Sequence, residues 1–136
     1  MTLCDAGPLV ALIDDKDPHH GRCVAAAEAL PPEPLVTTWP CWAEAMYLVG
    51  QVGGFPAQQR LWGLRRAGTL RLHFPGDAES DRMEVLMERY RDAPMDLGDA
   101  SLVAAAETLG FRRVFTLDRH FLFYRLNDSD TFDVIP

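Results

Sequence analysis

Two aspartates directly follow short apolar runs that are typical of buried β-strands. Asp5 follows the run Met1–Cys4, and Asp118 follows the run Val114–Leu117. Because the carboxyl ends of parallel strands meet at one edge of a sheet, we expect these two side chains to lie close together. Asp is also a favoured residue for capping a following helix or turn. The two roles are compatible, since a capping carboxylate can still present an oxygen to a cation.

A glutamate stands alone in a long apolar segment. Glu44 is the only charged residue between positions 39 and 52, and a helix that is apolar on nearly all sides is expected to be buried. A buried carboxylate destabilises the fold unless something pairs with it. Glu44 is therefore interpreted as a cation ligand or a base. The alternative is that its side chain reaches the surface or pairs with an arginine at the edge of the helix.

The segment 97–109 predicts a third acidic position. Asp99 shares a helical face with Leu102 and Val103, at spacings i+3 and i+4, so it should point at the core or at a cleft. Asp96 lies one turn earlier on the same side if the helix has begun by then. Because Gly98 precedes Asp99, a role as helix N-cap remains an alternative for Asp99.

Acidic side chains that gather from separate segments repel one another, which raises their pKa values and destabilises the fold. A divalent cation relieves this repulsion, and carboxylate oxygens favour Mg²⁺ or Mn²⁺. No His or Cys set has the spacing of a zinc site. The three cysteines are expected to be buried thiols, and the four histidines to be exposed or hydrogen-bonded: His19, His20, His73 and His120.

Short apolar strands alternate with helical segments along the chain, which predicts an α/β fold with a central, mainly parallel sheet and helices on both faces. Neither repeats nor linkers interrupt the pattern, so residues 1–136 are expected to form a single domain. The expected strands are 1–4, 35–38, 70–74, 113–117 and 132–135, and the expected helices are 6–13, 19–30, 39–52, 56–67, 78–90 and 97–109.

The composition limits the possible functions. The chain has 136 residues with 13 Lys and Arg against 20 Asp and Glu, so its formal charge is −7, and 48% of its residues are apolar. This balance excludes a disordered chain, and the excess acid excludes a general nucleic-acid coat. An enzyme that holds a cation beside a phosphate remains compatible with it. The acids from Asp77 to Asp92 are expected on an ordinary helix surface. With no long apolar run, a soluble cytoplasmic protein is expected.

Four segments together resemble the PIN-domain ribonucleases, in particular the VapC-type toxins of bacterial toxin–antitoxin pairs. Each segment is unspecific alone, but the ordered set covers the whole chain. Cys4 departs mildly from the family pattern, which more often has an aliphatic residue there. The segments are Leu3–Ile13, Thr37–Glu44, Pro94–Val103 and Val114–Phe121.

The resemblance implies a compact three-layer α/β/α sandwich, a Mg²⁺ or Mn²⁺ site and cleavage of RNA. It also implies a homodimer and inhibition by a small antitoxin protein. Carried over to this sequence, the family's acidic quartet corresponds to Asp5, Glu44, Asp99 and Asp118, an additional acid to Asp96, and the hydroxyl before the last acid to Thr116.

These residues predict metal-assisted hydrolysis of a phosphodiester bond. Asp5, Asp99 and Asp118 would hold the cation directly, and Glu44 would bind it through water or orient the attacking water. Asp96 is the residue that could support a second ion, and Thr116 could donate to a carboxylate or to phosphate. The candidate contacts to RNA phosphates are Arg65, Arg66, Arg112, Arg113 and Arg119.

Two other classes of protein stay open. Another Mg²⁺-dependent phosphohydrolase or a phospho-acceptor domain also places acids at strand ends, but would need an Asp-x-Asp start or a late lysine. Here Ala6 and Gly7 follow Asp5, and the only lysine is Lys16. The other alternative is a catalytically inactive PIN-like binding module. Five aromatic residues could form a partner surface or belong to the core: Trp39, Trp42, Trp62, Phe121 and Phe123.

Overall fold

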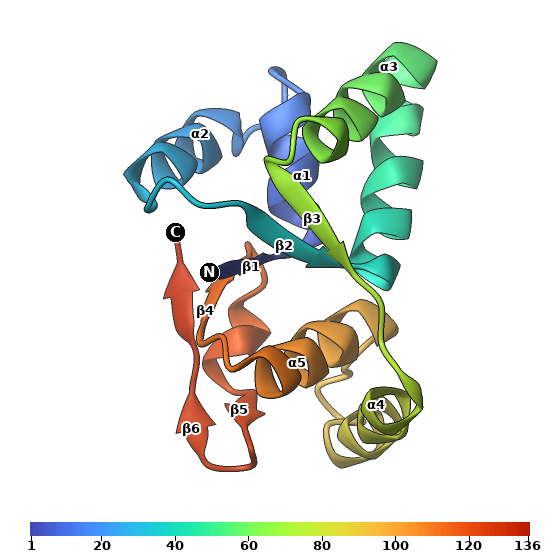
Figure 1. Ribbon diagram of the computed structural model, residues 1–136, viewed down its shortest axis with the longest axis vertical. Helices are drawn as coiled ribbons and strands as arrows, with labels where there is room; N and C mark the ends of the chain where they lie inside the picture. The colour runs from blue at the N-terminus through green and yellow to red at the C-terminus, as the bar shows by residue number, and fades with distance from the viewer.

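Five parallel strands form the central sheet of the computed structural model, which describes residues 1–136 (Figure 1). Their order is β3-β2-β1-β4-β7, and every neighbouring pair runs parallel. The expected mainly parallel sheet is therefore confirmed. The strands are β1 (Thr2–Cys4), β2 (Leu35–Thr38), β3 (Leu70–His73), β4 (Arg113–Phe115) and β7 (Asp133–Ile135).

Helices cover both faces of the sheet and create the three layers of the sandwich (Figure 1). The helices that pack in one core cluster lie on one face, and those that pack in the other cluster lie on the opposite face. Those on the first face are α1 (Ala6–Ile13), α2 (His20–Ala29) and α3 (Trp39–Arg66); those on the second are α4 (Asp77–Arg89) and α5 (Leu97–Leu109).

Alternation along the strands divides the core into two clusters, one for each face of the sheet. Leu3 and Val114 pack with α4 and α5, whereas the next residues, Cys4 and Phe115, pack with α1 and α3. Successive side chains of a strand point to opposite faces, so a strand covered on both faces must be apolar throughout. This explains the short uninterrupted apolar runs of the sequence.

The long helix α3 joins two predicted helices, 39–52 and 56–67, across a kink. The kink lies at Gly54, whose φ of 63° is a left-handed conformation that residues with a Cβ rarely adopt. Pro56 follows within the first turn of the second half, where its missing N–H is tolerated. The prediction of two helices is therefore confirmed: they meet at the non-helical residue Gly54, with no loop between them.

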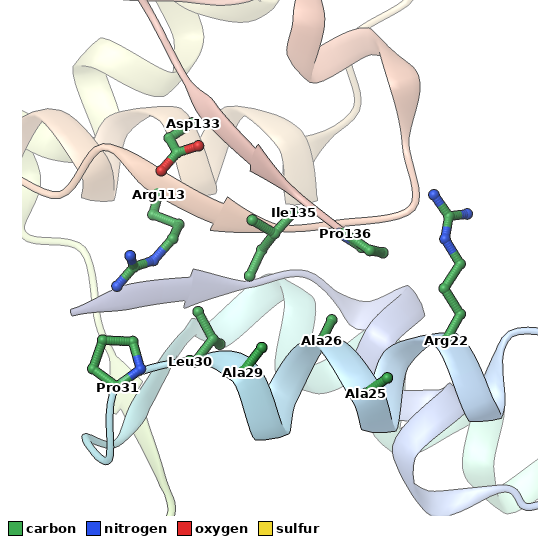
Figure 2. A pocket seen from close by; sticks show the side chains of 10 residues that line it. All are labelled: Arg22, Ala25, Ala26, Ala29, Leu30, Pro31, Arg113, Asp133, Ile135 and Pro136. Atoms are coloured by element: carbon green, nitrogen blue, oxygen red, sulfur yellow. The ribbon is translucent and has the colours of Figure 1, made fainter.

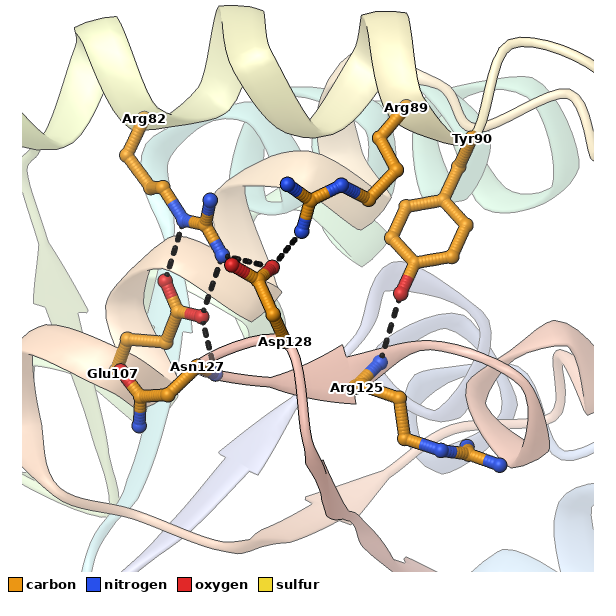
Figure 3. A network of polar contacts seen from close by, with 7 residues as sticks. All are labelled: Arg82, Arg89, Tyr90, Glu107, Arg125, Asn127 and Asp128. Carbon is orange, nitrogen blue, oxygen red and sulfur yellow. Dashed lines mark hydrogen bonds and ion pairs between the residues drawn. The ribbon is translucent and has the colours of Figure 1, made fainter.

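The hairpin of β5 (Arg125–Leu126) and β6 (Asp130–Thr131) is an element that the sequence patterns do not predict. Figure 3 shows how ion pairs attach it to α4 and α5. Arg82 donates to Glu107 at 2.8 and 3.0 Å and to Asp128 at 2.8 Å, and Arg89 also pairs with Asp128. The backbone N–H of Asn127 donates to Glu107 at 2.6 Å. Ion pairs thus attach the turn of the hairpin, while Leu126 of β5 is buried in the core cluster beside α4 and α5.

Two expectations about side chains have different outcomes. All three cysteines are buried and free, as expected. The expectation of an exclusively exposed α4 acidic face is wrong at Glu79, which is 8% exposed. Its two carboxylate oxygens lie 2.8 and 2.9 Å from the Nε2 atom of His73, so a specific partner compensates its burial.

No helix combines the length and apolar character needed to cross a membrane.

Candidate functional site

A cavity of about 300 Å³ lies at the carboxyl edge of the sheet, and we call it the carboxylate cavity. No positively charged side chain lines it. The fold thus brings all five predicted metal-binding acids to one place, although they come from four separate parts of the chain. The lining residues are Asp5, Ala6, Gly7, Glu44, Asp96, Asp99, Leu117 and Asp118.

Strand pairing brings the first and last acids together. Strands β1 and β4 are parallel neighbours, with Cys4 opposite Phe115, and the N–H of Asp5 donates to the carbonyl of Phe115 at 2.9 Å. The Thr116 hydroxyl donates to Asp5 Oδ2 at 2.7 Å and accepts the N–H of Asp118 at 3.0 Å. Of the two hydrogen-bonding roles predicted for Thr116, this structure contains the bond to a carboxylate.

The first and last acids also cap the elements that follow them. Asp5 Oδ1 accepts the N–H of Ala6 at 2.7 Å at the start of α1. Asp118 Oδ1 accepts the N–H of His120 at 2.9 Å at the start of the 3₁₀ helix η1 (Arg119–Leu122). Each carboxylate still borders the cavity. The capping interpretation and the placement at the cavity are therefore both correct.

A capping box at the start of α5 orients the next two acids. Asp96 is the N-cap, and its Oδ1 accepts the N–H of Asp99 at 2.8 Å, while Asp99 Oδ2 accepts the N–H of Asp96 at 3.5 Å. The alternative in which Asp99 is the N-cap is therefore wrong. Asp99 is the third residue of the helix and is only 7% exposed, so its carboxylate lies at the inner wall of the cavity.

Glu44 borders the cavity from α3, but the helix is not buried as expected. Glu44 is exposed, because α3 buries one stripe that includes Trp42 and Val49 and leaves its other faces to solvent. A Cβ atom placed on Gly98 would lie 3.7 Å from Glu44 Oε2 and 3.4 Å from Asp96 Oδ1. Gly98 therefore lies between the two acids, at van der Waals distance from both, where the starts of α3 and α5 meet.

Burial and mutual repulsion raise the pKa of several of these acids. Burial and the neighbouring Asp96 raise the pKa of Asp99 to about 7. The pKa of Asp5 is raised by burial, against the hydrogen bond from Thr116, and that of Glu44 by burial and then by Asp5. The carboxylates line the cavity without converging into a preassembled set of three ligands. Negative charge is thus concentrated in a cavity with no lysine or arginine in its lining, and the one basic side chain within ion-pair distance of these acids is His120, whose Nδ1 lies 2.9 Å from Asp118 Oδ1.

Tyr124 is a site residue that sequence reasoning missed. It is completely buried, and its hydroxyl donates to Asp99 Oδ2 at 3.0 Å. Its ring packs edge-on against Tyr90 and Phe121, with centroids 5.0 and 5.1 Å away. Tyr90 in turn accepts the backbone N–H of Arg125 at 3.2 Å (Figure 3). The only sequence signal was a hydroxyl-bearing aromatic residue shortly after Asp118, and nothing in the spacing pairs it with Asp99.

A second set of missed contacts lies behind the cavity. The Cys41 thiol lies 3.6 Å from both Asp5 Oδ1 and the Gly98 carbonyl. Thr38 and Ser101 share a buried hydrogen bond of 2.6 Å between their hydroxyl oxygens. These bonds connect the end of β1 with the starts of α3 and α5, and so fix the relative positions of the segments that carry the acids.

Most of the arginines predicted to contact RNA phosphates lie away from this cavity. Two of them end α3, just before β3, and two lie at the start of β4, which places all four at the amino edge of the sheet. One of these, Arg113, donates to the hydroxyl of Thr2 at 2.8 Å. Only Arg119, next to Asp118, is at the carboxyl edge. The arginines at the amino edge are Arg65, Arg66, Arg112 and Arg113.

The five aromatic residues divide between the core and the surface. Trp42 and Phe121 are buried, whereas Trp39, Trp62 and Phe123 are exposed. The exposed members lie on α3 and directly after η1. The alternative of core packing is therefore correct for two residues, and three remain available on the surface.

A three-layer sandwich with an acidic cavity at the carboxyl edge of a parallel sheet is the architecture of PIN-domain proteins. No protein-family model matches the chain, but a curated relative does. The chain is 30% identical over 139 aligned residues to ribonuclease VapC26 of Mycobacterium tuberculosis, covering 98% of this chain and 99% of the relative. The chain belongs to the VapC family of ribonucleases.

Solved structures support the same fold. VapC20 of Mycobacterium tuberculosis, a toxin that cleaves the sarcin–ricin loop, superposes with a TM-score of 0.84 over 100% of both chains at 17% identity. A toxin–antitoxin complex from Klebsiella pneumoniae matches over 87% of both chains, with a TM-score of 0.66 and 22% identity. VapBC2 of Rickettsia felis, bound to a promoter DNA fragment, matches over 99% of this chain and 98% of the other, with a TM-score of 0.67 and 11% identity.

The raised pKa of Asp99 predicts how Asp99→Asn changes stability without metal. Between the ordinary Asp pKa and about 7, the folded protein binds more protons than the unfolded chain, so stability falls as pH rises. Asp99→Asn removes this loss and should stabilise the protein by roughly 1–3 kcal/mol at pH 8, with the gain vanishing near pH 4. Urea unfolding across this pH range in the presence of EDTA measures the difference.

The matched control is Asp15→Asn, which makes the same change at an exposed position outside the cavity. Its effect on stability should be small and should not follow the same pH profile. A destabilisation by Asp99→Asn that is equal at pH 5 and pH 8 would contradict the interpretation, because it would indicate only the loss of a hydrogen bond.

Proposed function

We propose that this protein is a metal-dependent endoribonuclease that hydrolyses RNA phosphodiester bonds at the carboxylate cavity and is the toxin of a toxin–antitoxin pair. The observation that carries the proposal is a cavity lined by five acids, without a positively charged side chain, in a member of the VapC ribonuclease family. A cation site explains why negative charge is concentrated at the expense of stability.

The chemistry of the donor set favours Mg²⁺ or Mn²⁺. All the charged groups that line the cavity are carboxylates, which are the hard oxygen ligands these ions prefer. The nearby Cys41 thiol is not an alternative ligand of the soft type, because burial holds its pKa well above the usual value and keeps it protonated.

The proposed roles follow from where each acid lies. Asp5, Asp99 and Asp118 hold the cation directly, and Asp96 supports a second ion. When bound, the ion supplies Lewis-acid polarisation of the phosphate, neutralises negative charge that develops on it and lowers the pKa of water. Thr116 orients Asp5 through its 2.7 Å hydrogen bond to Oδ2. The other oxygen, Oδ1, accepts the N–H of Ala6 at the start of α1.

Glu44 has a separate role in this proposal. It lies on the exposed rim of the cavity, where solvent water can reach it, and it binds the ion through water or orients the attacking water. Its raised pKa, caused by burial and by Asp5, makes it a stronger base than an ordinary glutamate when it is deprotonated.

The partners proposed are an RNA substrate, a small antitoxin protein and a second copy of the chain. Structures of toxin–antitoxin complexes are among those with this fold, which supports the antitoxin. Exposed apolar side chains support a protein interface: Trp39, Trp62 and Phe123 are 46%, 38% and 70% exposed. The whole chain acts as one domain, and the cytoplasm is the compartment in which it meets RNA.

Incubation of the purified protein with labelled RNA and Mn²⁺ tests the activity. We expect internal cleavage by the wild-type protein, and a loss of at least roughly a hundredfold in rate for Asp5→Asn and Asp99→Asn, because each substitution removes a charged ligand. Asp15→Asn should cleave like the wild type. Equal cleavage by wild type and Asp99→Asn would refute the site assignment.

Failure to cleave any RNA pool, together with a failure to bind Mn²⁺, would instead favour the inactive binding module. Cleavage of small phosphate esters but not of RNA would favour another phosphohydrolase.

Metal addition should stabilise the folded protein. At a Mn²⁺ concentration about 100 times the Kd, linkage raises stability by about 2.7 kcal/mol, which is roughly 5–10 °C in Tm for a chain of this size. Differential scanning fluorimetry at pH 7.5 with Mn²⁺ and with EDTA measures this shift. Asp5→Asn should abolish most of it, and an unchanged wild-type Tm would count against a shared metal site.

Tyr124→Phe should shift the pH dependence of Mn²⁺ binding upward. The Tyr124 hydroxyl donates to Asp99 and lowers the pKa of that carboxyl, so its removal keeps Asp99 protonated to a higher pH. We expect weaker Mn²⁺ binding at pH 6.5–7 and near-normal binding at pH 8.5, measured by titration calorimetry. The exposed Tyr47→Phe is the control, and a Tyr124→Phe affinity that is reduced equally at both pH values would contradict the argument.

A further inference from the structure

A second cavity adjoins the carboxylate cavity and, unlike it, has guanidinium groups in its lining. It also measures about 300 Å³, and the two cavities share Leu117 and Asp118 in their linings. Arg22 from α2 and Arg119 from η1 line this second cavity, which we call the arginine cavity. Leu117 and Asp118, which follow β4, therefore form a common wall, and Asp118 contributes its carboxylate to the lining of both cavities.

Both guanidinium groups are free of partners. Arg22 and Arg119 are exposed, and neither makes an ion pair or a side-chain hydrogen bond. By contrast, Arg82 and Arg89 form ion pairs with the carboxylates of Glu107 and Asp128. Figure 2 shows Arg22 extending from α2 beside Pro136, at the opposite end of a separate apolar groove from Arg113. The two arginines thus present unsatisfied donors to an open cavity.

This arrangement suits a polyanion that spans both cavities. The carboxylate cavity attracts a phosphate only through a bound cation, and the five acids repel any phosphate beside it. Two free guanidinium groups next to that cavity offset the repulsion and provide planar donor pairs that match phosphate oxygens. The charged side chains of this cavity are the two arginines and Asp118, and the remaining lining residues are uncharged: Thr116, Leu117, Leu122, Val134 and Pro136.

We propose that Arg22 and Arg119 form a phosphate-binding site that holds the RNA backbone one nucleotide or more to one side of the scissile phosphate. This inference rests on the proposed function, since it assumes RNA cleavage in the carboxylate cavity. The contact involves the backbone and carries no base specificity of its own. It places the strand on the α2–η1 side of the catalytic acids and so sets the direction from which RNA enters.

Salt-dependent binding of single-stranded RNA tests the site. The parent protein is Glu44→Gln with Mg²⁺, because this variant keeps the three acids proposed to hold the cation directly. The probe is a labelled oligoribonucleotide whose integrity is checked on a gel. Fluorescence anisotropy gives the Kd at several salt concentrations. We expect Arg22→Gln and Arg119→Gln each to weaken binding roughly tenfold and to reduce the slope of log Kd against log salt by about 0.7. Both effects should be the same for oligonucleotides of different sequence.

Arg71→Gln is the matched control, because it removes the same charge from an exposed arginine of β3, outside both cavities. It should leave the Kd and the salt slope nearly unchanged. If all three variants behave alike, or if the parent does not bind RNA, the phosphate site is refuted. The Tm of each variant is measured as well, and an unchanged Tm shows that weaker RNA binding is not caused by unfolding.

The two proposals can fail separately. Cleavage by the wild-type protein with no specific effect of Arg22→Gln and Arg119→Gln would refute this site and leave the nuclease intact. Absence of cleavage, with a specific loss of RNA binding in the two variants, would retain the phosphate site and refute the proposed activity.

Discussion

Repulsion among five carboxylates at one edge of the sheet is the constraint on which the arrangement of this protein depends. The parallel topology brings the ends of β1, β4 and the starts of α3 and α5 together, and each of these segments contributes an acid. Burial, and after it the neighbouring carboxylates, raise the pKa of Asp5 and Asp99. The fold therefore carries an electrostatic cost that packing elsewhere must offset.

Local hydrogen bonds and helix termini reduce this cost without removing it. Asp5, Asp96 and Asp118 each cap a following helix or turn, so backbone N–H groups and the positive end of a helix dipole face their carboxylates. Thr116 and Tyr124 donate hydroxyl groups to Asp5 and Asp99. All of these donors are neutral, which leaves the charge itself to be balanced by something that binds.

The sequence predicts what depends on local pattern and strand order. Apolar runs ending in Asp5 and Asp118 indicate a shared sheet edge, and the helical face of Asp99 indicates its burial; the structure agrees with both. Glu44 is the instructive error. Its apolar surroundings suggested a buried helix, but α3 packs along one stripe and exposes residues such as Val52 to solvent. Composition alone cannot distinguish a buried helix from one whose second face is left for a partner.

Contacts across the fold explain what the sequence could not predict. Tyr124 reaches Asp99 because the segment after η1 packs in the core against Tyr90 at the end of α4, and ion pairs attach the hairpin that follows (Figure 3); no spacing rule encodes these contacts. Arg22 is likewise near Asp118 through the tertiary packing of α2, not through sequence. A net charge of −7 consequently gives little information about phosphate binding, because a phosphate responds to the charged side chains that lie near it in space. Here two free guanidinium groups lie directly beside the acids, at the edge where the strands end.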